Sequence, residues 1–173
     1  MGMGRGRSSW RVNMDMKNVV RLIVACAVSL GAGLIGSLVT IGGGPQLWYA
    51  TLAKPFFTPP NWVFSPVWTV LYLLMGIAAF LVWRKGLVSA GVKTALAWFL
   101  VQLSLNALWT PVFFGLHRIG PALVVIVLLW AAIVATMRRF LRISRLAGVL
   151  LVPYLLWVSF AAVLNASLWH LNR

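Results

Sequence analysis

Apolar residues along this chain form five long runs, and short polar or basic stretches separate them. Each run approaches the roughly 20 apolar residues that cross a bilayer as a helix. The pattern predicts an all-α integral membrane protein, a five-transmembrane-helix bundle with an ordered first extramembrane loop. A basic, Gly-rich stretch over residues 1–18 predicts a flexible tail before a membrane domain over 19–173. The predicted helices cover residues 19–41, 66–83, 95–115, 120–137 and 146–169.

Glycine and proline mark where these helices begin, bend and end. Gly42-Gly43-Gly44-Pro45 ends the first helix. Ser65-Pro66 begins the second, because serine is a good N-cap and proline suits the first helical turn. Thr110-Pro111 predicts a kink near the outer end of the third helix, and Pro153 predicts an irregularity in the fifth.

The charge distribution predicts how the chain lies in the membrane. The sequence is 62% hydrophobic and only 9% charged, whereas a soluble domain is about a quarter charged. Only Lys54, Arg118 and Arg173 fall on the side of the first loop. The cations on the other side are Arg5, Arg7, Arg11, Lys17, Arg21, Arg84, Lys85, Lys93, Arg138, Arg139, Arg142 and Arg145. This positive-inside pattern predicts a cytoplasmic N-terminus and a C-terminus on the opposite side, and it accounts for the charge without a nucleic-acid partner.

The sequence contains almost no acidic residues. The only acidic residue, Asp15, lies in the tail, so no carboxylate is available at membrane depth for proton coupling or for general acid-base catalysis. His117 and His170 fall near the outer ends of helices, where an isolated histidine is usually solvated. The single cysteine, Cys26, permits no intrachain disulfide and no cysteine cluster. We therefore predict no metal site.

Three helical faces combine aromatic side chains with a few amides and no charge, since residues three or four apart share one side of a helix. The amides either hold helices together, as buried amides commonly do, or line a pocket for a flat, largely apolar ligand. Spacing alone leaves both interpretations open. The faces are Trp68–Tyr72–Met75 on the second helix, Gln102–Asn106–Trp109 on the third and Pro153–Trp157–Ala161–Asn165 on the fifth.

Small residues recur every four positions along the first helix. This spacing lets a neighbouring helix approach closely, so it predicts either tight packing or room for a ligand. With the small residues around the start of the third helix, it also indicates a homodimer. The two rows are Ser29–Gly33–Ser37 and Ala32–Gly36–Thr40.

Three segments resemble one known family. They read WYATLAKPFFTPPNWVFSPVWTVLYLLMG (48–76), QLSLNALWTPVFF (102–114) and PYLLWVSFAAVLN (153–165). They are similar to the translocator protein / tryptophan-rich sensory protein family (TspO/MBR), once called the peripheral benzodiazepine receptor. The pattern W-Y-x-x-L-x-K-P-x-x-x-P-P-x-W is highly specific, and the resemblance covers about residues 19–172.

The resemblance implies a five-helix bundle, often dimeric, whose first loop folds over a pocket open between the first two helices. Family members bind porphyrins such as protoporphyrin IX and haem, sterols and benzodiazepine-like drugs. Some bacterial members promote light- and oxygen-dependent porphyrin breakdown, attributed to two tryptophans that match Trp68 and Trp157. Tyr49, Asn106 and Ala161 match other pocket-lining positions, and we expect a bacterial membrane as the location.

The sequence departs from the family pattern in three respects. Alanines replace acidic or amide residues around Lys54, so no salt bridge to this lysine is expected in the loop, and Phe56 stands where tryptophan is common. The sterol motif of animal members needs a cation within about five residues of a tyrosine. After Tyr154 the next cation is Arg173, so sterol transport has little support.

We expect a tryptophan-lined pocket under residues 52–64, a proline-rich lid that loses little entropy when it closes. No cofactor is required: porphyrin or haem is the ligand, and membrane lipid and sterol-like molecules are further partners. The expected role is tetrapyrrole transport, sensing or regulation. The alternatives are porphyrin degradation through Trp68 and Trp157, or a structural or partner-binding membrane protein. The expected binding residues are Tyr49, Phe56, Pro59, Trp68, Tyr72, Gln102, Asn106, Trp109, Trp157 and Ala161.

Overall fold

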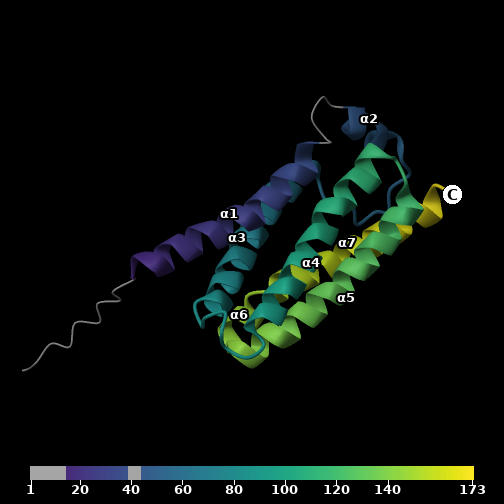
Figure 1. Cartoon of the computed structure of the whole chain (residues 1–173). Helices are drawn as coiled ribbons and strands as arrows, with labels where there is room; N and C mark the ends of the chain where they lie inside the picture. Colours follow the sequence, from purple (N-terminus) through teal and green to yellow (C-terminus); the bar gives the residue numbers. More distant parts are fainter. Residues whose placement is uncertain (1–14, 39–43) are drawn as a thin grey trace, which may run out of the picture.

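Five long helices form the body of the protein in a computed structural model, which describes residues 15–38 and 44–173 but not the side chains of residues 45 and 46 (Figure 1). All five are long and apolar enough to cross a membrane, and the described residues contain no strand. The prediction of an all-α integral membrane protein is therefore confirmed. The spanning helices are α1 (Met16–Leu38), α3 (Phe64–Trp83), α4 (Val92–Thr110) with the π-helix η2 (Pro111–Gly115), α5 (Ile119–Ile143) and α7 (Val152–Leu171).

Three short helices complete the chain: α2 (Gly44–Thr51), the 3₁₀ turn η1 (Asn61–Val63) and α6 (Arg145–Val149). The expected end of the first helix at Gly42-Gly43-Gly44-Pro45 lies partly outside the described residues. Thr40 and most of the predicted tail also lie outside them. The sequence pattern indicated α2 only as part of a loop. An eight-residue helix with a polar and glycine-rich start carries too little periodicity to be distinguished from a turn.

The second spanning helix begins earlier than predicted. Pro60 is extended (φ −57°, ψ 144°), η1 follows it, and α3 then begins at Phe64. Ser65 therefore lies inside the helix, and no side chain caps its N-terminus. Pro66 still falls in the first turn, where its missing N–H removes no helical hydrogen bond.

The predicted kink at Thr110-Pro111 takes the form of a wider turn. The amide of Leu116 donates to the carbonyl of Pro111 over 2.9 Å, which closes the π-helix η2. Such a turn inserts an extra residue into the helix. It brings Phe113 into the interior, where only 1% of its surface is exposed.

The end of the fourth spanning helix and the start of the fifth also differ from the prediction. Helix α5 continues to Ile143, so most of the expected basic loop at 138–145 is helical. Basic side chains are good helix formers and are stabilised near a helix C-terminus. The chain breaks at Ser144 (φ −152°), and the predicted fifth helix is divided into α6 and α7, with Pro153 in the first turn of α7.

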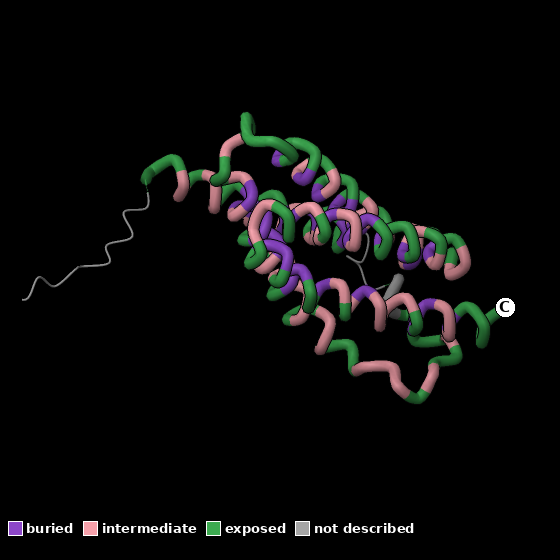
Figure 2. Tube along the Cα trace, turned by 90° about the horizontal axis from the view of Figure 1, so that it is seen from below, coloured by how far each residue is buried: buried purple, intermediate pink, exposed green. Residues whose placement is uncertain are grey.

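The small residues of α1 face its neighbours in the bundle. A Cβ at Gly33 would overlap the ring of Tyr72 on α3, and one at Gly36 would lie 3.2 Å from Oγ1 of Thr110 on α4. The predicted tight packing along these rows is therefore an intramolecular contact. Figure 2 shows the general pattern, in which buried positions alternate with exposed ones along each helix.

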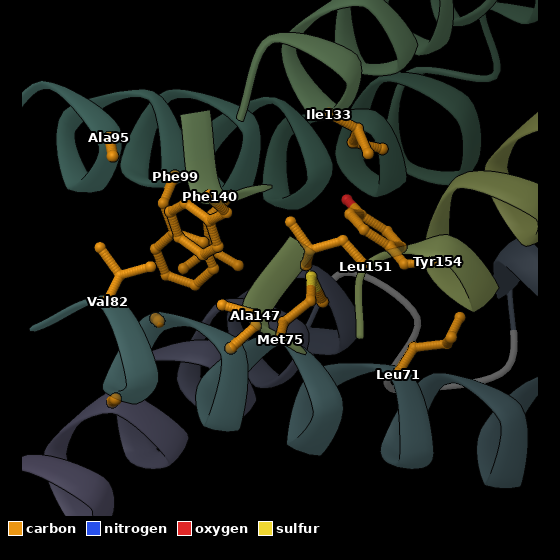
Figure 3. Packing of buried hydrophobic residues seen from close by; sticks show 14 of the residues in the cluster. Leu71, Met75, Val82, Ala95, Phe99, Ile133, Phe140, Ala147, Leu151 and Tyr154 are labelled. Atoms are coloured by element: carbon orange, nitrogen blue, oxygen red, sulfur yellow. The ribbon is translucent and has the colours of Figure 1, made fainter. Parts of the chain in front are cut away.

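The half of the bundle near α6 is solidly packed. Phe99 and Phe140 stack there with their ring centroids 6.0 Å apart. Met75, Leu151 and Tyr154, each at most 1% exposed, fill the neighbouring space (Figure 3). The opposite end of the bundle, near α2 (Figure 1), is where the helices leave space between them.

Candidate functional site

A cavity of about 670 Å³ lies in the half of the bundle near α2. This volume is in the range of pockets for small organic ligands, about 300–1,000 Å³. Residues from all five spanning helices and from α2 line it, and most of them are apolar. The aromatic lining residues are Tyr49, Phe64, Trp68, Tyr72, Trp109, Phe113, Phe114 and Trp157.

Most of the expected site residues come together at this cavity. The lining contains Tyr49, Trp68, Tyr72, Asn106, Trp109, Trp157 and Ala161. Phe56, Pro59 and Gln102 do not line it. Phe56 is fully exposed on the loop, and Gln102 is buried (1% exposed) one turn deeper along α4, where its Nε2 lies 3.9 Å from Sδ of Met75. Residues with the right helical spacing can still lie beyond the end of a cavity.

Two groups of stacked rings belong to the lining of the cavity. On α3, Trp68 stacks on Tyr72 with ring centroids 5.4 Å apart and planes 29° from parallel. At the end of α4, Trp109 stacks on Phe113 at 4.9 Å and 20°. Trp157 on α7 meets Phe64 edge-on at 5.8 Å. Flat, polarisable surfaces of this kind favour stacking with another ring system.

Asn106 holds three helices together at the wall of the cavity. Its Oδ1 accepts a hydrogen bond from the Tyr72 hydroxyl at 2.5 Å, and its Nδ2 donates to the Tyr154 hydroxyl at 3.1 Å. The residue is only 5% exposed. Interhelical hydrogen bonds inside a membrane protein contribute about 0.6–2 kcal/mol each, so Asn106 connects α3, α4 and α7.

Asn165 plays the same part at a second position in the cavity lining. Its Oδ1 accepts from the Trp109 indole at 3.1 Å, and its Nδ2 donates to the carbonyl of Ile119 at 3.0 Å. These two bonds join α7 to α4 and to the start of α5. Both amides therefore hold helices together and also line the cavity, so the two interpretations of these polar positions are compatible.

The indole N–H of Trp157 is buried and has no hydrogen-bond partner among the described residues. A buried donor without an acceptor costs about 1–3 kcal/mol. The ring of Trp157 lines the cavity, whereas its indole nitrogen is closed off from the cavity surface. The oxygen Oε1 of Gln102 is likewise unpartnered, but that residue does not line the cavity.

Among the residues that the structure describes, no charged side chain lines the cavity. The nearest cation along the first loop is Lys54, whose ammonium nitrogen lies 4.6 Å from the centre of the Tyr49 ring. This cation–π contact takes the place of the salt bridge that the loop sequence cannot form. Burial raises the pKa of the Tyr49 phenol above its usual value of 10, so Tyr49 presents a neutral hydroxyl at physiological pH.

The first loop is attached to the bundle at Tyr49 and at Ala53. Tyr49 on α2 is 7% exposed and lies 5.7 Å from the Phe114 ring. The side chain of Asn172, just beyond α7, accepts from the amide of Ala53 and donates to its carbonyl, both at 2.9 Å. Sequence reasoning missed Asn172, because a contact across 119 positions leaves no local signal. It also missed Phe113 and Phe114, which only the π-helical turn places at the cavity.

Known proteins resemble this chain over most of its length. Residues 23–170 match the profile of the TspO/MBR family. The chain is 44% identical over 161 residues to the tryptophan-rich protein TspO of Chlorobaculum tepidum, covering 90% of this chain and 98% of that protein. It is 42% identical over 149 residues to protein CrtK of Rhodobacter capsulatus, covering 86% and 89%. It is also 42% identical over 154 residues to the human translocator protein, covering 85% and 86%. The resemblance inferred from the three sequence segments is thus confirmed, and the chain belongs to the TspO/MBR family.

Proposed function

We propose that this membrane protein binds tetrapyrroles such as protoporphyrin IX or haem in the cavity under its first loop, and thereby acts in their transport, sensing or regulation. One observation carries the proposal: a cavity of about 670 Å³, whose described lining carries no charge, has stacked aromatic rings from both α3 and α4 in that lining. Such a cavity favours a flat, mainly apolar guest over a compact charged one.

The polar groups at the cavity wall support the same class of ligand. The amides of Asn106 and Asn165 are already engaged with other helices. Most of the remaining lining is apolar or aromatic, which favours a mainly apolar guest. A tetrapyrrole supplies a large ring system for the walls and a small number of polar atoms at its edge.

A fluorescence titration tests the proposal. Adding protoporphyrin IX to the protein in lipid nanodiscs, in the dark, is expected to quench tryptophan fluorescence saturably. Replacing Trp68→Phe together with Trp157→Phe should weaken binding by at least about fivefold, because two stacking surfaces shrink. The matched control is Trp83→Phe with Trp130→Phe, which removes two tryptophans that do not line the cavity. Equal dissociation constants for the two double variants would contradict the proposal.

Porphyrin breakdown is the second candidate function, and the position of Trp68 and Trp157 at one cavity favours it. Under light and air, the Soret band of bound protoporphyrin IX should then decay faster with the wild-type protein than with the Trp68→Phe, Trp157→Phe variant. Equal decay at equal occupancy would leave only free photobleaching.

We also propose that the N-terminus is cytoplasmic and the C-terminus lies on the opposite side of a bacterial membrane, as the basic residues between the spans indicate.

A homodimer stays a prediction. The glycines Gly33 and Gly36 give it no support, since they face α3 and α4 of the same chain.

A further inference from the structure

Four arginines at the end of α5 and the start of α6 have no acidic partner. They are Arg138, Arg139, Arg142 and Arg145. The chain has one acidic side chain, Asp15, which lies before the start of α1, and the described residues contain no salt bridge to any of the four arginines. Like charges three or four positions apart on a helix destabilise it. An anion from outside the chain would remove this repulsion.

Arg139 is held in place from two sides. Phe99 and Phe140 stack inside the bundle (Figure 3). Their chain neighbours, Trp98 and Arg139, also meet: the guanidinium carbon lies 4.7 Å from the centre of the indole ring. Nη1 of Arg139 donates to the carbonyl of Ala135 at 2.9 Å. The cation–π contact and the hydrogen bond restrict the guanidinium before any anion arrives, so less entropy is lost on binding.

Most of the hydrogen-bonding capacity of this guanidinium stays available. A guanidinium has five N–H donors, and the bond to Ala135 uses one of them. Arg142 lies three positions further along α5, on the same side as Arg139, and it is exposed. Arginine binds phosphate through two parallel hydrogen bonds in a fixed geometry. The pair Arg139 and Arg142 therefore suits a phosphate group.

An apolar surface leads directly to these arginines. Val124, Val127 and Ala131 are exposed and share one side of α5, and Arg138 and Arg142 continue the same side. Because α5 is long and apolar enough to cross a membrane, its exposed apolar side faces lipid. The apolar part ends just before Arg138, so the arginines lie at the level of the lipid headgroups.

We propose that the seam between α4 and α5, at the α6 end of the bundle, binds one anionic phospholipid. Arg139 and Arg142 hold its phosphate, and an acyl chain lies along Val127 and Ala131. A soluble anion or an acidic peptide would meet the same charges, but only a lipid also covers the apolar surface that leads to them. None of these residues lines the cavity, so this site is independent of the proposed tetrapyrrole binding.

Native mass spectrometry of the detergent-solubilised protein tests the site. The protein is titrated with phosphatidylglycerol or with phosphatidylcholine of the same acyl chains. The wild type should bind the first phosphatidylglycerol at least about fivefold more tightly than phosphatidylcholine. Arg139→Gln and Arg142→Gln should each weaken phosphatidylglycerol binding about fivefold and leave phosphatidylcholine binding unchanged. Arg139→Lys should fall between wild type and Arg139→Gln, because lysine keeps the charge but loses the two-bond geometry.

Arg21→Gln is the matched control. Arg21 is also half-buried, and its guanidinium carbon lies 6.0 Å from the centre of the Trp83 ring. The variant therefore removes the same charge and the same kind of aromatic contact, but on α1. Its affinity for phosphatidylglycerol should change by less than about twofold. An equal loss in Arg21→Gln and Arg139→Gln would indicate diffuse attraction to a basic surface and overturn the site, as would equal affinity of the wild type for the two lipids.

A competition experiment separates a lipid from a soluble anion. Glycerol 3-phosphate carries a phosphate but no acyl chain, so at matched concentration it should not displace phosphatidylglycerol from the wild type. Displacement would assign the arginines to soluble phosphates and overturn the lipid as occupant. Arg142 is exposed, so Arg142→Gln should unfold at the wild-type temperature, and its loss of lipid binding then reports on the site and not on folding.

Discussion

At the scale of single residues, Tyr72 contributes both to the packing between helices and to the candidate site. Its ring lies against Gly33 of α1, it stacks on Trp68, and its hydroxyl donates to Asn106. The same side chain therefore closes the α1–α3 contact and forms part of the cavity wall. A change that displaces the Tyr72 ring should alter both stability and ligand affinity.

Two glycines on α1 test the contribution of this contact to stability. Gly33→Ala places a methyl group on the Tyr72 ring, so the ring must move and the protein should lose about 1–3 kcal/mol of stability. Gly31→Ala is the control, because nothing lies within 4 Å of the added Cβ and alanine is the better helix former by up to about 1 kcal/mol. Thermal unfolding in detergent, followed by circular dichroism, measures the difference. Similar melting temperatures for the two variants would show that the contact with Tyr72 does not matter.

At the scale of elements, the spanning helices are predictable from sequence and the connections around the cavity are not. Each apolar run satisfies its own backbone hydrogen bonds as a helix, which lipid requires. Helix α2 and the turn η2 have no such local determinant. Their positions depend on tertiary contacts. The rings of Trp48 and His117 stack with their centroids 4.3 Å apart, and two hydrogen bonds, which we call the Asn172 clamp, join Asn172 to Ala53.

The two hydrogen bonds of the Asn172 clamp can be removed without changing a residue that lines the cavity. Asn172→Ala deletes both hydrogen bonds to Ala53, worth about 1–3 kcal/mol together, and should free the start of the 52–64 segment. Hydrogen exchange measured by mass spectrometry should become at least about fivefold faster in peptides that cover residues 52–58. His170→Ala, an exposed change on the last turn of α7, should leave their exchange unchanged. Unaltered exchange in Asn172→Ala would mean that the loop is held by its aromatic contacts alone.

At the scale of the whole molecule, buried side chains fill the bundle near α6, and the cavity lies in the half near α2. Figure 1 shows these two short helices at opposite ends of the bundle. The proposed orientation places the solid half at the cytoplasmic side and the cavity at the opposite side. The basic residues support it: Arg84, Lys85 and the α5 arginines lie near α6, whereas Lys54 and Arg118 lie near the cavity. Ligand would then enter from the outer leaflet or from the space outside the membrane.

Cysteine labelling in intact cells tests this orientation. In a Cys26→Ala background, Leu116→Cys should react with a membrane-impermeant maleimide in intact cells, because its loop faces outward. Val88→Cys, fully exposed in the α3–α4 connection, should react only after the membrane is opened. The opposite pattern would place the N-terminus outside and contradict the positive-inside interpretation.

The sequence by itself determined the membrane environment, the five spanning helices, the near-absence of acidic chemistry and the family. These properties depend on residues close together in the chain, because a helix in lipid must satisfy its backbone locally. The tertiary structure decided which candidate residues share one cavity. It placed Trp68, Asn106 and Trp157 together but left Phe56 and Gln102 apart from them. A cavity is a volume that side chains from several helices leave unfilled, so it depends on widened turns, glycine contacts and long-range clamps that local spacing does not encode.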